Sequence, residues 1–316
     1  MTRAQRVLIL IAATLFGLLP ILVYGMEHGG LVAPAVLESE AMTANQQLAQ
    51  VVAGLIFKPT YMFLSLILII ALIGQTATEI ASLRWGLVAF LAGETFCAIN
   101  FYVYRHESLL SEYAHSFGMA LAFGFLTFAL LEILDKRLLH INHGRCAVNE
   151  LCATCKRTSP LACTARRTAQ FAVPMFALLS FLPLGVPLAP TSYATEIFGF
   201  AYSYTRFDLY QWYETRVLPL TALACFALAF LPLLRKGGDP IPTFTTILFS
   251  AGLGALGFSL FRVTLASMFR ENLVWFEFWE EATELMFVAA VGFVMWQFRK
   301  TLLEQTPLLK SILENR

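Results

Sequence analysis

The stretch TYMFLSLILIIALIGQTAT at residues 60–78 decides the fold class, because it carries no charged side chain over a length that can cross a bilayer. Further apolar runs of similar length lie at residues 6–25, 85–104, 113–134, 168–188, 218–234, 243–267 and 275–298. The pair Lys58-Pro59 suggests the start of the segment at residues 60–78, which is the second along the chain. The sequence therefore predicts an all-α, polytopic membrane protein with about eight transmembrane helices.

The composition agrees with this fold class. Hydrophobic residues make up 58% of the chain and charged residues only 14%. The mean hydropathy is +0.68. Such a chain has too few charges to cover the surface of a soluble protein. We therefore expect its main partner to be the lipid bilayer in which it is inserted.

The distribution of lysine and arginine predicts the orientation. The loops on one side hold most of the cations, and that side includes both termini and the loop at residues 137–167. The opposite loops hold few, among them Arg105, Arg206, Arg216 and Arg270. Because excess cations mark the cytoplasmic side, we expect a multi-pass protein of a bacterial-type inner membrane with both termini in the cytoplasm. This orientation explains the basic loop, so we infer no nucleic-acid partner from it.

Four of the six cysteines lie in that cytoplasmic loop: Cys146, Cys152, Cys155 and Cys163. In a reducing compartment, clustered thiolates favour a metal over disulfides. The spacing C-x5-C-x2-C-x7-C contains one tight pair flanked by single cysteines. It favours an iron–sulfur cluster, a [4Fe–4S] centre, with structural zinc or no metal as the alternatives.

Cys97 and Cys225 lie alone in apolar runs. We interpret both as small core residues.

The strongest polar signal inside a predicted membrane segment is WFEFWEEATEL at residues 275–285. On a helix, Glu277, Glu280 or Glu281, and Glu284 form one acidic stripe, because they recur at spacings of three, four and seven. Ionised groups at such depth cost several kcal/mol each unless they are paired, hydrated or bound to a metal. A functional role is therefore expected for this stripe.

Two other intramembrane residues could meet the stripe. Glu94 lies near the middle of the segment at residues 85–104, and Arg262 lies near the outer end of the segment at residues 243–267. A pairing of Arg262 with Glu281 or Glu284 would offset the burial of charge without any catalytic role. The remaining carboxylates would still require protons, water or a cation, which predicts a proton or cation path.

His115 offers a second possible metal site. It lies at the outer end of its predicted helix with Glu112, on the side where Glu277 and Glu280 are also expected. Imidazole and carboxylate ligands suit zinc or nonhaem iron. The competing interpretation is that these are separate residues at the membrane interface.

The chain is consistent with two tandem four-helix units at residues 1–136 and 168–300, joined by the Cys-rich loop at 137–167 and followed by a tail at 301–316. A shift of the first unit by 165 positions places Arg105 on Arg270. The outer segment at residues 190–217 is rich in aromatic residues. Such residues suit either a membrane interface or a lid over a lipid-soluble ligand such as a quinone.

These features predict a membrane redox protein that exchanges electrons between the iron–sulfur cluster and a membrane quinone or a partner subunit, with Glu94 and the acidic stripe handling protons. One alternative is a proton- or metal-cation-coupled transporter whose Cys-rich loop is held by structural zinc. A noncatalytic assembly subunit is the other.

Overall fold

The computed structural model describes residues 35–36, 42–104, 108–139, 164–188, 190–206, 208–235, 241–269, 272–297 and 299. The α-helices are α2 (Ala44–Val51), α3 (Lys58–Ala71), α4 (Thr78–Tyr102), α5 (Leu109–Ile133), α7 (Thr164–Leu179), α8 (Asp208–Trp212), α9 (Leu218–Leu234), α10 (Thr243–Met268) and α11 (Leu273–Gln297). Short π-helical segments are η1 (Val52–Phe57), η2 (Leu134–Leu139) and η5 (Tyr213–Val217), and η4 (Pro183–Gly185) is a 3₁₀ turn. The strands are β1 (Ala35–Val36), β2 (Thr191–Ile197) and β3 (Phe200–Arg206).

Six helices in the described part of the chain are long and apolar enough to cross a membrane. They span Ala44–Ala71, Thr78–Tyr102, Leu109–Lys136, Ala165–Gly185, Asp208–Leu234 and Thr243–Met268. Helix α11 is also 25 residues long, but four glutamates lie in its first half. The predicted helix at residues 6–25 lies outside the described residues, as do residues 140–163 of the Cys-rich loop with Cys146, Cys152, Cys155 and Cys163. The ends of the predicted loop are helical, since η2 extends to Leu139 and α7 begins at Thr164. The structure thus supports a multi-pass membrane protein.

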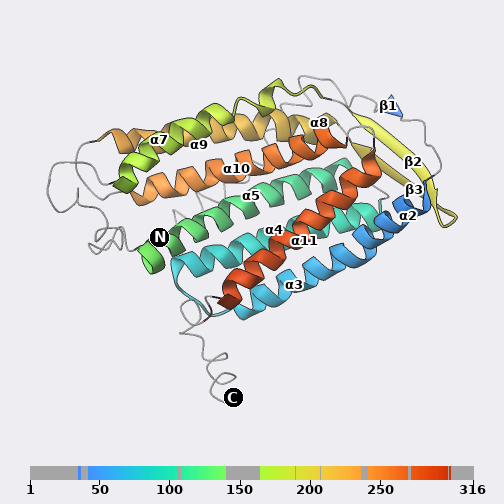
Figure 1. Ribbon diagram of the computed structural model, residues 1–316, viewed down its shortest axis with the longest axis horizontal. Helices are drawn as coiled ribbons and strands as arrows, with labels where there is room; N and C mark the ends of the chain where they lie inside the picture. The colour runs from blue at the N-terminus through green and yellow to red at the C-terminus, as the bar shows by residue number, and fades with distance from the viewer. Residues whose placement is uncertain are drawn as a thin grey trace, which may run out of the picture.

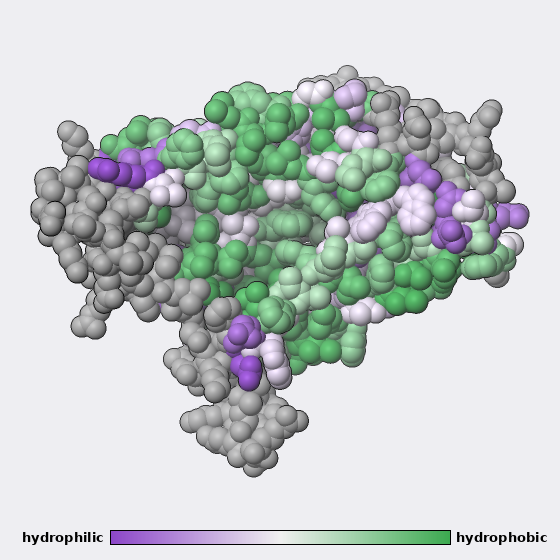
Figure 2. Space-filling view, in the orientation of Figure 1, coloured by the Kyte–Doolittle hydropathy of each residue, from purple (hydrophilic) through white to green (hydrophobic). Residues whose placement is uncertain are grey.

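The helices form one elongated bundle (Figure 1). Helix α5 packs against α4 and α10, α9 packs against α10 and α7, and α3 packs against α4 and α11. Hydrophobic residues cover the middle of the face in Figure 2, and hydrophilic residues gather towards its edges. This pattern matches a surface that meets lipid along its length and water at its ends.

Glycines bring α4 and α5 unusually close together. A Cβ atom added at Gly118 would lie 2.8 Å from the Cα atom of Gly93, a distance that real Cβ atoms do not tolerate. Small residues allow helix backbones to approach in this way in membranes. Because Glu94 follows Gly93 and His115 lies one turn before Gly118, the contact also places these two side chains near each other.

Two of the long spans contain a π-helical segment just before a proline. Segment η1 precedes Pro59, and η5 precedes Pro219. Proline cannot donate the usual backbone hydrogen bond, and a locally widened turn accommodates this loss. The expected helix start at Lys58-Pro59 was therefore wrong, since the helical segment begins at Ala44 and continues through the proline.

The expectation of an entirely helical chain was incomplete. Strands β2 and β3 form an antiparallel hairpin, and β1 pairs in parallel with β2. The two turn residues, Phe198 and Gly199, both have positive φ angles, of 49° and 83°, as tight hairpin turns require. The hairpin lies at one end of the bundle (Figure 1). There Tyr204 packs in a small core with Leu265, Leu273 and Phe276.

Candidate functional site

A group of buried charged and polar side chains lies in the part of the bundle nearest the hairpin. It comprises Lys58, Tyr61, Glu94, His115, Glu214, Arg262, Glu280, Glu281 and Glu284, and we call it the acidic cluster. Helices α3, α4, α5, α10 and α11 contribute to it, together with the π-helical segment η5. All nine residues are buried, so their charges must be compensated within the protein.

One half of the acidic cluster is organised by Lys58. Its Nζ atom lies 3.1 Å from Oε2 of Glu94 and 2.6 Å from Oε1 of Glu281. The same ammonium group lies 3.0 Å from the Tyr61 hydroxyl and 3.3 Å from Sγ of Cys97. The Tyr61 hydroxyl contacts Oε2 of Glu94 and lies 2.7 Å from Oε2 of Glu281. A single lysine thus joins carboxylates of α4 and α11.

The other half is organised by Arg262. Its Nε atom donates to Oε1 of Glu214 at 2.8 Å, and its Nη1 atom donates to Oε1 of Glu280. Ser116 supports Glu214 with a hydrogen bond of 3.1 Å. Arg262 is therefore a charge partner, as predicted from sequence. Its partners are Glu280 and Glu214, however, and not the expected Glu281 or Glu284.

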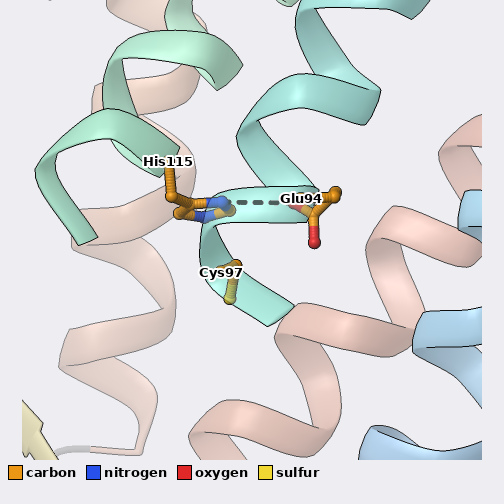
Figure 3. A group of neighbouring side chains, drawn as sticks. All are labelled: Glu94, Cys97 and His115. Atoms are coloured by element: carbon orange, nitrogen blue, oxygen red, sulfur yellow. Dashed lines mark ion pairs between the residues drawn. The ribbon is translucent and has the colours of Figure 1, made fainter. Parts of the chain in front are cut away.

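His115 lies between the two halves. Its Nδ1 atom is 3.3 Å from Oε1 of Glu94, and its Nε2 atom is 3.8 Å from Oε1 of Glu280. Figure 3 shows His115 pointing from α5 towards Glu94 on α4, with Cys97 a turn away from Glu94. Within the described part of the chain, neither ring nitrogen has a partner with hydrogen-bond geometry. The ring nitrogens could therefore act as ligands for a metal ion.

Glu284 is the exceptional member of the cluster. Its side chain is buried, yet among the described residues neither carboxylate oxygen has a hydrogen-bond partner. The cluster contains five carboxyl groups, namely those of Glu94, Glu214, Glu280, Glu281 and Glu284, against the fixed cations Lys58 and Arg262. Since full ionisation would leave negative charge uncompensated in a buried site, the cluster must hold protons or a further cation.

Three sets of side chains in the cluster could hold a metal ion, because their ligand atoms lie within 4.8 Å of one another. They are Glu94 with Cys97 and His115, His115 with Glu280 and Glu284, and Glu94 with Glu281 and Glu284. Lys58 already neutralises Glu94 and Glu281. Arg262 likewise pairs with Glu280. Glu284, which belongs to two of the three sets, is therefore the carboxylate that suits an added cation best.

Glu112 and Glu277, the other residues considered for a metal site, have different partners. Asn100 donates to Oε1 of Glu112 at 2.8 Å, and the Tyr202 hydroxyl donates to Glu277. Burial, reinforced by the Glu277 carboxylate, raises the pKa of Tyr202 well above its usual range, so this hydroxyl keeps its proton and can donate it. Of the residues considered for this site, His115 and Glu280 lie close enough to hold a metal ion together, with Glu284 as the third ligand.

Sequence reasoning missed three members of the cluster. Lys58 and Tyr61 were passed over because Pro59 was interpreted as the start of a helix, which left Lys58 at the membrane surface. Glu214 was placed in an outer loop, but it lies in the π-helical segment η5. A lysine within a long apolar helix is the signal that could have revealed the first half of the site.

Comparison with known proteins does not extend this description. The chain matches no protein-family model, no curated protein and no solved structure. The function must therefore be argued from the site itself.

Proposed function

We propose that this protein is a proton-coupled membrane transporter and that the acidic cluster is its proton site. The observation that carries the proposal is Glu284, a buried carboxyl group with two unpartnered oxygens beside four other carboxyl groups and two fixed cations. A proton on Glu284 removes a buried charge that no hydrogen bond from a described residue compensates. Release of that proton requires a compensating change nearby, which is what coupling to a solute provides.

The hydrogen bonds of Tyr61 support the presence of an extra proton. The hydroxyl group lies at hydrogen-bond distance from both Glu94 and Glu281, and it also receives a hydrogen bond from Lys58. A hydroxyl group has one hydrogen to donate. The hydroxyl group can therefore donate to only one of the two carboxyl groups. The other carboxyl group can form a hydrogen bond to the hydroxyl oxygen if it carries a proton and acts as the donor. The cluster therefore has places for protons at more than one carboxyl group.

The position of the cluster between the two halves of the chain also favours transport. Lys58, Tyr61, Glu94 and His115 come from the first predicted unit, whereas Glu214, Arg262 and the glutamates of α11 come from the second. In transporters built from repeated units, coupling sites lie at the interface between the units. The π-helical segments before Pro59 and Pro219 support a duplication, because they recur at comparable places in the two units.

The proposal includes eight transmembrane helices, with residues 6–25 as the first and α11 as the last. An ideal helix of the 25 residues of α11 is about 37 Å long, enough to cross the hydrocarbon core. Exposed Met286, Phe293 and Trp296 give α11 an apolar outer face. The cation distribution supports the part of the proposal that puts both termini in the cytoplasm and the protein in a bacterial-type inner membrane.

The redox function remains a prediction. It depends on Cys146, Cys152, Cys155 and Cys163, which lie outside the described residues. A [4Fe–4S] cluster in that loop, with a quinone or partner subunit as its redox partner, would favour electron transfer. Zinc there would suit the transporter, because it would stabilise the connector between the two units.

The proposal is tested with purified protein in liposomes that contain a trapped pH-sensitive dye. Pools of organic acids, inorganic anions, amino acids, sugars and divalent cations are added outside under an acidic-outside gradient. We expect at least one pool to drive proton entry with the wild-type protein, and we expect Glu284→Gln to abolish it. The matched control is Glu132→Gln, since Glu132 is also buried but has an ion pair with Lys136 at 2.6 Å. Proton entry in Glu284→Gln equal to wild type, or no response to any pool, would overturn the proposal.

A further inference from the structure

A small cavity opens beside the acidic cluster, at the hairpin end of α10. Its volume is about 210 Å³, and Arg206, Arg262 and Glu214 line it together with Gln211 and Thr215. Its remaining wall is largely apolar, with side chains such as those of Val186 and Val263. The volume is below the usual range for drug-sized ligands, so the cavity suits a small solute.

Two arginines that line this cavity each have a buried hydrogen-bond donor without a partner among the described residues. Arg262 uses Nε and Nη1 on Glu214 and Glu280, but its buried Nη2 atom has no partner among the described residues. The Nε atom of Arg206 is also buried without a partner there. Arg206 is only 6% exposed. Burial of a donor without a partner destabilises the protein, so both positions favour an acceptor.

The two guanidinium groups are held by the same aromatic ring. The Cζ atom of Arg206 lies 4.9 Å from the centroid of the Phe276 ring, and that of Arg262 lies 5.2 Å from it. Stacking of this kind restricts a guanidinium group while leaving its N–H edge available. The arrangement is therefore ordered before any ligand binds.

From this geometry we infer that the cavity binds the carboxylate or phosphate group of a small anionic solute, through Arg206 and the free edge of Arg262. Guanidinium groups match such oxyanions, because their N–H donors form charge-assisted and often paired hydrogen bonds. The apolar wall suits a short hydrocarbon portion of the solute. The assignment of this anion as the transported solute rests on the proposed function; the binding site itself does not.

The position of Arg262 links the cavity to the acidic cluster. The charged groups around the proposed anion are Arg206, Arg262 and Glu214, with Glu280 on the other side of Arg262 and His115 at 3.8 Å from Glu280. An anion at the free edge adds negative charge beside Glu214 and Glu280. Uptake of a proton by the cluster offsets this charge, so anion and proton are expected to bind together.

The binding site is tested with the full-length protein in detergent. The probes are propionate, inorganic phosphate and dihexanoylphosphatidylglycerol, and binding is measured by calorimetry and by the shift in melting temperature. We expect propionate or phosphate to bind and to stabilise the wild-type protein. Arg206→Gln should weaken that affinity about ten- to a hundredfold, as expected for the loss of charge-assisted hydrogen bonds. Arg206→Lys should restore only part of it, because the charge returns without the planar fork.

Arg235→Gln is the matched control, because Arg235 is exposed just beyond the opposite end of α9. It should bind the anion as the wild type does. Equal affinity in Arg206→Gln and wild type, or no binding of either soluble anion, would overturn the site. Binding of the phospholipid alone would assign the cavity to a lipid headgroup and overturn the assignment to a solute.

The two proposals fail in different ways. Anion binding that is lost in Arg206→Gln, without any anion-driven proton entry in liposomes, would overturn transport and leave the site in place. Proton entry driven only by uncharged or cationic solutes would overturn the assignment of the anion as the transported solute and leave proton coupling in place.

Discussion

Replacement of Lys58 by methionine tests whether this one ammonium group holds the first half of the acidic cluster together. Methionine keeps a long unbranched side chain but removes the charge, which lies 2.6 Å from Glu281 and 3.1 Å from Glu94. Removing one partner of a buried ion pair destabilises a protein by about 3–5 kcal/mol. Since Lys58 serves two buried carboxylates, we expect Lys58→Met to fall at the upper end of this range.

The expected loss of stability has an upper limit that depends on pH. Each carboxylate that no longer has its ammonium partner can bind a proton instead. With an ordinary glutamate pKa of about 4.3, protonation of one carboxyl group at pH 7 costs roughly 4 kcal/mol, and this cost falls by about 1.4 kcal/mol for each unit of lower pH. Stability of Lys58→Met relative to wild type should therefore recover as the pH is lowered towards 5. In the wild-type protein the ammonium group of Lys58 neutralises these carboxylates, so they need not take up protons.

The measurement is unfolding in mixed micelles by titration with a denaturing detergent, repeated at several pH values. Lys136→Met is the matched control, because Lys136 also lies near two carboxylates, at 2.6 Å from Glu132 and 3.4 Å from Glu79, but its side chain is 32% exposed. Exposed pairs contribute about 0–1 kcal/mol. Equal losses in the two variants, or a loss in Lys58→Met that does not change with pH, would refute the argument from burial.

Two further predictions concern the membrane topology and the Cys-rich loop. Reporter domains inserted near Asn149 and fused after Arg316 should lie in the cytoplasm and one near Thr191 on the opposite side; a periplasmic reporter at Asn149 would make disulfides the leading interpretation of the cysteine loop. Cys152→Ser should lose bound iron or zinc in metal analysis of anaerobically purified protein, because a hydroxyl group is a poor substitute for a thiolate. Cys225→Ser should retain the metal, and retention in both variants would count against a site at Cys152.

The helical class could be predicted from sequence because uninterrupted apolar runs leave few alternatives in a bilayer. The hairpin could not be predicted by the same reasoning. Its aromatic residues were interpreted as part of a membrane interface or of a lid over a lipid-soluble ligand, although aromatic and β-branched residues are also typical of strands. The dipeptide Phe198-Gly199 at the turn was the local signal, since glycine adopts positive φ angles readily.

The acidic stripe could be predicted from spacing, but its partners could not. Glu280 and Glu281 are neighbours on a helix and point about 100° apart. Glu280 consequently meets Arg262 of α10, whereas Glu281 meets Lys58 of α3. Which helix lies on which side of α11 is set by the packing of the whole bundle, and close contacts such as that between Gly93 and Gly118 help to determine it.

A purely structural role explains part of the acidic cluster but not Glu284. Lys58 and Arg262 each join two carboxylates from different elements, which is how a buried ionic network would fasten a bundle. Glu284 adds another carboxyl group to that network without gaining a hydrogen bond from any described residue. An apolar side chain of similar size at this position would avoid the desolvation penalty and could stabilise the fold. The presence of a carboxyl group there instead supports the proposed binding of a proton or cation.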